Sequence, residues 1–128
     1  MDDLRYRLDD FELYKMARGF RHKVYQLIRQ LPPTQRYCLD PQMRREVVSI
    51  TNNIAEGHGR WHYQENIQYC RTARGSTEEI IDDLNLCIDE CYGDHHIVDE
   101  LKAEAYCLVS RINGYIVYLR KAQDSGRK

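Results

Sequence analysis

The chain has 128 residues, which is enough for one domain with a substantial core. Charged residues make up 30% of it and apolar residues 42%, a balance that excludes a disordered protein. The formal net charge of −1 excludes a protein that attracts nucleic acid through a strong overall positive field. No apolar run reaches the roughly 20 residues of a membrane span, and no secretion signal is recognisable. We therefore expect a cytoplasmic protein, no membrane partner, and five cysteines that are reduced thiols.

Heptad spacing predicts a first helix over residues 9–31, with Asp9 and Glu12 at the spacing of a capping box. Gly19 lies inside this helix, where it costs about 1 kcal/mol relative to Ala, and it predicts a close neighbouring backbone. A second face is basic, with one aromatic residue in it. The apolar stripe consists of Leu13, Ala17, Phe20, Val24, Leu27 and Leu31, and the basic stripe of Lys15, Arg18, His22, Tyr25 and Arg29.

A second helix is predicted over residues 41–57, after a Pro-Pro pair that ends the first. Asp40 is expected to cap it and Pro41 to take its first position, and Gly57 favours its end. Polar and β-branched residues crowd around its apolar seam, so helix propensity contributes little and packing must stabilise it. The seam consists of Met43, Val47, Ile50 and Ile54.

Two longer helices are predicted over residues 63–92 and 95–122, separated by Gly93 and a capping Asp94. Short connections make consecutive helices antiparallel. The sequence thus predicts an all-α, up-down-up-down four-helix bundle in one domain, 1–128.

Charge is uneven along the chain. Residues 1–75 hold 13 Lys and Arg against 9 Asp and Glu, and residues 76–128 hold 6 against 11. Ordinary solvated helix faces would explain this. Attraction between opposite ends of neighbouring copies would also explain it, and would favour a ring.

The sequence contains no standard metal-binding or catalytic motif. Cys87, Cys91, His95 and His96 form a Cys2His2 set on paper, but their spacing is not a standard zinc pattern. Both cysteines fall on the apolar seam of the third helix, where free Cys behaves as a small hydrophobic residue. The chain has no Glu-x-x-His pair, no nucleophile elbow and no phosphate-binding glycine loop. We predict no catalytic residue, no metal, no cofactor and no small-molecule substrate.

Two groups of polar residues remain. The first is predicted to form a structural network between the second and third helices, or else a recognition patch: Arg45, Asn53, Glu56, Arg74, Ser76 and Glu79. The second comprises candidate contacts to RNA phosphates and unpaired bases, although the chain has no recognised RNA-binding motif: Lys15, Arg18, Arg21, Lys23, Arg29, Arg44, Arg60, Trp61 and Arg71.

Two separated motifs carry a family resemblance. The stretch QMRREVVSITNNIAEGHGR over residues 42–60, followed by ARGSTEE over residues 73–79, resembles the 23S rRNA intervening-sequence proteins. The departures are Glu46, where the family has a small residue, and the ring-rich turn at residues 61–63. The resemblance implies a bacterial four-helix bundle that assembles as a homopentameric ring. It is similar in fold to the accessory variability protein of diversity-generating retroelements, which binds a reverse transcriptase and nucleic acid.

The resulting hypothesis is a non-enzymatic, ring-forming binding or scaffold protein with RNA, or an RNA-associated protein such as a reverse transcriptase, as its partner. The alternative is a protein–protein interaction module with no nucleic-acid role. A third hypothesis is a metal- or thiol-dependent activity at Cys87, Cys91, His95 or His96.

Overall fold

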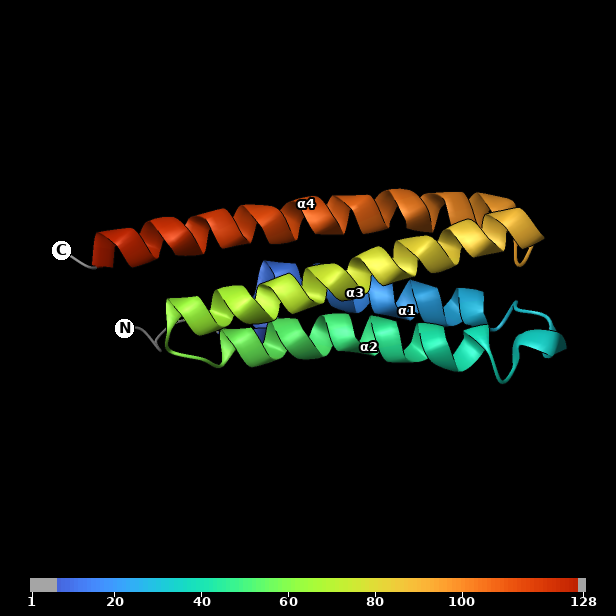
Figure 1. Ribbon diagram of the computed structural model, residues 1–128, viewed down its shortest axis with the longest axis horizontal. Helices are drawn as coiled ribbons and strands as arrows, with labels where there is room; N and C mark the ends of the chain where they lie inside the picture. Colours follow the sequence, from blue (N-terminus) through green and yellow to red (C-terminus); the bar gives the residue numbers. More distant parts are fainter. Residues whose placement is uncertain (1–6, 127–128) are drawn as a thin grey trace.

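A computed structural model describes residues 7–126 and forms an antiparallel four-helix bundle. Consecutive helices run in opposite directions along a common long axis, and α1 begins at the end where α4 finishes (Figure 1). Residues 7–126 include no strand, so the predicted all-α, up-down-up-down architecture is confirmed. The elements are a 3-10 turn Leu8–Asp10, α1 Glu12–Ile28, a 3-10 turn Pro33–Gln35, α2 Leu39–His58, α3 Tyr63–Glu90 and α4 His95–Gly126.

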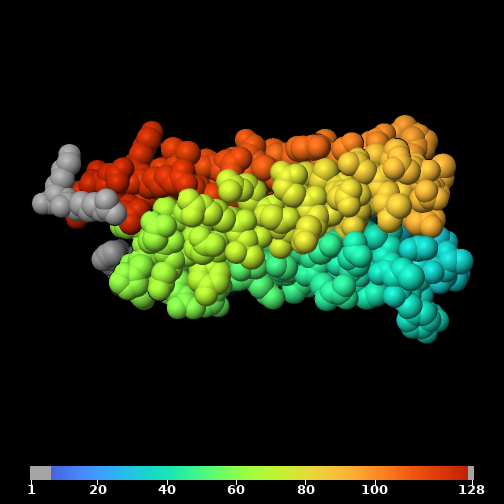
Figure 2. All heavy atoms as spheres, viewed as in Figure 1, coloured from blue at the N-terminus to red at the C-terminus, as the bar shows by residue number. Residues whose placement is uncertain are grey.

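The core lies along the axis between the four helices. Each helix packs against two neighbours: α1 against α2 and α4, and α3 against the same two. Phe20, Met43, Ile80 and Leu108, one from each helix, are fully buried. Side chains of α2, α3 and α4 fill the spaces that the ribbon leaves open (Figure 2). None of the helices within residues 7–126 has the length and apolarity that crossing a membrane requires.

Several predicted helix ends are wrong. The first helix begins at Glu12 rather than at residue 9, because residues 8–10 form a 3-10 turn and buried Phe11 takes the N-cap position without a side-chain cap. It also ends at Ile28, before the predicted residue 31. The sequence pattern could not reveal these ends, since apolar spacing continues past both of them.

The second helix begins at Leu39, before the predicted Asp40 cap. Asp40 lies in its first turn and accepts a hydrogen bond from Arg44 Nε at 2.6 Å. The third helix ends at Glu90, before the predicted residue 92, and the fourth extends to Gly126, beyond the predicted residue 122. The capping role of Asp94 is confirmed, because its Oδ1 accepts hydrogen bonds from two backbone N–H groups at the start of α4.

The close approach predicted at Gly19 occurs elsewhere. A Cβ added at Gly19 would meet nothing within 4 Å, and the residue is exposed. At Gly57, near the end of α2, a Cβ would lie 2.6 Å from Asn66 Oδ1 and 3.1 Å from Tyr69 Cβ. The last turn of α2 and the first turns of α3 therefore approach each other closely.

Candidate nucleic-acid interface

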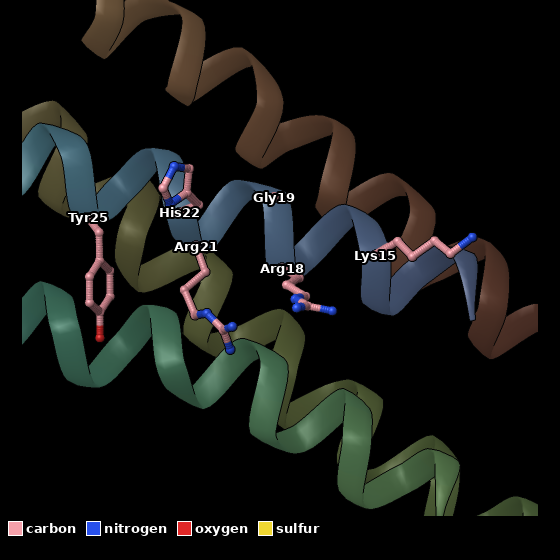
Figure 3. Close-up of a pocket in the computed structure, with 6 residues that line it drawn as sticks. All are labelled: Lys15, Arg18, Gly19, Arg21, His22 and Tyr25. Carbon is pink, nitrogen blue, oxygen red and sulfur yellow. The ribbon is translucent and has the colours of Figure 1, made fainter. Parts of the chain in front are cut away.

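The outer surface of α1 carries positive charge without intervening acidic residues. From Leu13 to Arg29 the helix and its C-cap contain five Lys or Arg residues and no Asp or Glu. Five side chains and Gly19 line an open groove of about 470 Å³ on this surface (Figure 3). Because Gly19 has no side chain, the groove reaches the helix backbone between its neighbours. We call this surface, with Arg29 one turn further on, the α1 basic face: Lys15, Arg18, Arg21, His22, Tyr25 and Arg29.

Among residues 7–126, acidic partners occur only at the N-terminal end of the α1 basic face. Lys15 Nζ lies 3.2 Å from Glu12 Oε2, and Arg18 Nη1 lies 3.9 Å from Asp9 Oδ1. All four side chains are at least half exposed. Exposed pairs of this kind contribute roughly 0.2–1 kcal/mol each, so a phosphate can replace the carboxylates at small cost.

On the side of the α1 basic face that adjoins α2, side chains of the two helices contact each other. Arg21 and Tyr25 extend from α1 toward α2 (Figure 3), and Arg21 Nη1 donates to Thr51 Oγ1 at 2.9 Å. The guanidinium of Arg44 lies over the Tyr25 ring, 5.1 Å from its centroid. The hydrogen bond from Arg44 to Asp40 raises the pKa of Arg44. These contacts hold two cations and one ring in fixed positions beside the groove.

The remaining candidates for nucleic-acid contact lie elsewhere. Lys23 faces α4, where its Nζ is 3.0 Å from Glu104 Oε1. Arg71 lies on α3, which does not neighbour α1, and its nearest side-chain partner is Gln68. Arg60 and Trp61 lie in the connection from α2 to α3, at the end of the bundle where His58 stacks on Phe11 with centroids 5.2 Å apart. The structure thus brings together five of the nine candidates, on α1 and the adjoining turn of α2.

The predicted polar network is divided among several contacts. Asn53 Nδ2 donates to Ser49, whose hydroxyl lies 2.9 Å from that of Ser76, and this chain joins α2 to α3. Arg74 instead bonds to Asn113 of α4 at 2.6 Å, and Glu56 pairs with Arg60 at 2.7 Å. Arg45 and Glu79 are exposed, and both act electrostatically on Glu46.

One polar cluster between α2 and α3 was not predicted from the sequence. Glu46 of α2 lies within hydrogen-bonding reach of Asp83 of α3, and Gln42 Nε2 donates to Asp83 Oδ1 at 2.8 Å. Burial, followed by the contact with Asp83, raises the pKa of Glu46 to about 9, and burial also raises the pKa of Asp83. Glu46 Oε1 and Asp83 Oδ2 are buried and accept no hydrogen bond from a donor within residues 7–126. The raised pKa of Glu46 favours its protonated form near neutral pH, in which its carboxyl can donate a hydrogen bond to Asp83. The departure at Glu46 was the one sequence feature that could have indicated this pair.

The cysteine and histidine set has no metal-site geometry. Within the described residues, no group of three or more His, Cys, Asp and Glu side chains is placed to hold a metal. Burial raises the pKa of Cys87 to about 11, which keeps its thiol protonated and unreactive. Cys91 does not continue the apolar seam as predicted: it is exposed and ends α3 in a left-handed conformation with φ of 58°.

The antiparallel arrangement of α1, α2, α3 and α4 defines this chain as a four-helix-bundle protein. Residues 9–114 match the family model of the 23S rRNA-intervening sequence protein, and the chain belongs to that family. No curated protein matches the sequence. The chain is similar to a crystal structure of a protein of unknown function from the S23 ribosomal protein family of Bacteroides thetaiotaomicron. The TM-score is 0.72 with 16% identity, over 81% of this chain and 97% of that one, a likeness that shows the fold alone.

Proposed function

We propose that this protein is a non-enzymatic binding or scaffold module whose α1 basic face binds the phosphate backbone of RNA. The observation that carries the proposal is the absence of any acidic residue from Leu13 to Arg29 in a chain with a net charge of −1. Positive charge concentrated on one surface is the usual electrostatic footprint of a nucleic-acid site.

The spacing of the cations supports phosphate contacts. Lys15, Arg18 and Arg29 follow one another at helical intervals of three and eleven residues, so their side chains leave the same side of α1. A row of cations along one side of a helix can follow the phosphates of a single RNA strand. The open groove at Gly19 leaves room for a phosphate between the side chains that line it.

Aromatic groups offer a second type of contact. Trp61 is 67% exposed and Tyr63 is 45% exposed, both at the end of the bundle where α1 begins. Rings at such a position can stack on unpaired bases, which contributes about 1–3 kcal/mol per base. Single-stranded RNA, either bare or held by an RNA-associated protein such as a reverse transcriptase, is therefore the favoured ligand.

Charge reversal on the α1 basic face tests the proposal. We expect Arg18→Glu combined with Arg29→Glu to weaken binding of a fluorescent single-stranded RNA by at least about tenfold at low salt. The slope of log K against log salt should become shallower by about 0.7 for each phosphate that the variant no longer neutralises. Fluorescence anisotropy over a salt series measures both quantities.

The control is Arg71→Glu, which reverses a half-buried cation on α3, away from the α1 basic face, and should leave affinity unchanged. A loss of binding free energy in the control about half that of the double variant, in proportion to the number of reversed charges, would indicate a general charge effect and no defined face. An absence of salt-dependent binding by the unsubstituted protein would refute the RNA proposal and favour the protein-interaction module.

A further inference from the structure

A second groove lies between α1 and α4, and its volume is about 240 Å³. Leu27 and Leu101 belong to the buried core, and Ile97 is half-buried beside them, so the floor of this groove is apolar. We call it the α1–α4 groove. Its polar walls are formed by Lys23, Gln26 and Gln30 of α1 and by Glu100 and Glu104 of α4.

Two contacts hold the walls of the α1–α4 groove in place. Lys23 Nζ lies 3.0 Å from Glu104 Oε1, and the Glu104 side chain is only 24% exposed. At the other end, the backbone N–H of Asp94 donates to Gln30 Oε1 at 2.9 Å. These side chains are therefore already ordered, and a ligand that enters between them meets a groove that needs little reorganisation.

Glu100 leaves the groove with an uncompensated negative charge. It is exposed, and it forms no ion pair with a Lys, Arg or His within residues 7–126. Glu100 and Glu104 are one turn apart on α4, a spacing at which like charges repel each other. Because Lys23 can offset only one of these two charges, a second cation would be favourable here.

The segment that supplies the α4 wall is strongly acidic. Residues 75–101 contain nine Asp or Glu and no Lys or Arg. They form the C-terminal part of α3, the turn after it and the first turns of α4. Asp89 and Glu90 lie in the last turn of α3, where the helix dipole disfavours negative charge. These charges are unfavourable for α3 itself and favourable for a cationic partner.

We propose that the α1–α4 groove binds an arginine side chain in a basic segment of a partner protein. The aliphatic part of the arginine covers the apolar floor. Its guanidinium donates to both Glu100 and Glu104, because its N–H groups form a planar fork that an ammonium lacks. The exposed Gln26 amide on the opposite wall can accept a further hydrogen bond through its oxygen. The acidic segment at residues 75–101 attracts the rest of the basic segment.

This inference goes beyond RNA binding and does not depend on it. The groove lies on the side of α1 that faces α4, whereas the α1 basic face points outward and toward α2. One bundle can therefore hold RNA on one side of α1 and a basic protein on the other, as a scaffold would.

NMR titration of the isotope-labelled protein with a blocked glycine–arginine–glycine peptide tests the proposal. We expect saturable shifts of the backbone amide signals along residues 23–30 and 97–104. The corresponding lysine peptide should bind at least about threefold more weakly, because an ammonium cannot bridge both carboxylates. Glu100→Gln should raise the dissociation constant of the arginine peptide at least about fivefold.

The control variant is Asp99→Asn, which removes a neighbouring exposed charge outside the groove. It should change the dissociation constant by less than about twofold, since solvent and salt screen this charge from the groove. Equal losses in the two variants, or shifts located elsewhere, would overturn the proposal and indicate unspecific attraction to the acidic segment. No RNA is present, so the result does not depend on the outcome of the RNA experiment.

Two further results would overturn the choice of partner. Binding of n-butylguanidinium without binding of the peptide would show that the groove takes a small molecule and no protein side chain. Self-association of the unsubstituted protein that Glu100→Gln abolishes in sedimentation equilibrium would identify the occupant as a second copy of this chain.

Discussion

Gly57→Ala is expected to destabilise the protein by about 1–3 kcal/mol, the usual cost of overpacking a tight contact. The new methyl group would lie 2.6 Å from Asn66 Oδ1, 3.1 Å from Tyr69 Cβ and 3.3 Å from the Asn66 carbonyl oxygen. Rotation of the Asn66 side chain would relieve only the first contact. It would also disturb the hydrogen bond from Asn66 Nδ2 to the Tyr115 hydroxyl, which joins α3 to α4. Urea unfolding at equilibrium measures the change.

The same substitution at open helix positions is the matched control. Gly19→Ala and Gly75→Ala each place the methyl group where no atom lies within 4 Å. Both should therefore stabilise the protein by about 0.5–1 kcal/mol through helix propensity alone. A gain at Gly57 equal to the gains at these two positions would refute the close approach of α2 and α3.

Glu46→Gln is expected to remove the pH dependence of the free energy of unfolding that arises from the buried carboxyl pair of Glu46 and Asp83. The pKa of Glu46 is about 9 in the folded protein and close to its ordinary value of 4.5 when unfolded. Between these values the folded state binds more protons than the unfolded state, so the free energy of unfolding falls as pH rises. The stabilisation that protonated Glu46 contributes is complete below the pKa that Glu46 has in the unfolded chain. It is lost as the pH rises through the pKa that Glu46 has in the folded protein. Asp83, whose pKa burial also raises, contributes in the same direction.

The Gln amide in this variant can donate a hydrogen bond to Asp83, and it does not titrate in this pH range. We expect Glu46→Gln to raise stability by about 1–3 kcal/mol near the alkaline end of the range, where the natural protein holds a poorly satisfied buried carboxylate. It should also flatten the slope between about pH 6 and about pH 9. Urea unfolding over a pH series gives both values.

Glu79→Gln is the control for this second prediction. Glu79 is exposed and affects Glu46 only through its charge, so this variant should keep most of the slope. If Glu46→Gln unfolds with the same pH dependence as the unsubstituted protein, the carboxyl pair does not share a proton across this range.

The pattern of apolar residues determined the fold. Heptad spacing in the first and last helices, and short connections between all four, leave an antiparallel bundle as the arrangement that buries every apolar stripe. Phe20 and Leu108 are buried as this spacing requires. The basic stripe on α1 could also be predicted, because helical periodicity fixes which side chains share a face.

Contacts between helices were decided by the tertiary structure alone. The sequence contains Glu46 and Asp83 as two ordinary acidic residues 37 positions apart, and only the packing of α2 on α3 buries them together and raises their pKa values. The sequence predicts a close neighbouring backbone at Gly19 and only a helix end at Gly57, yet Gly19 faces open space and Gly57 meets Asn66, since the distance between helices is not a property of either helix.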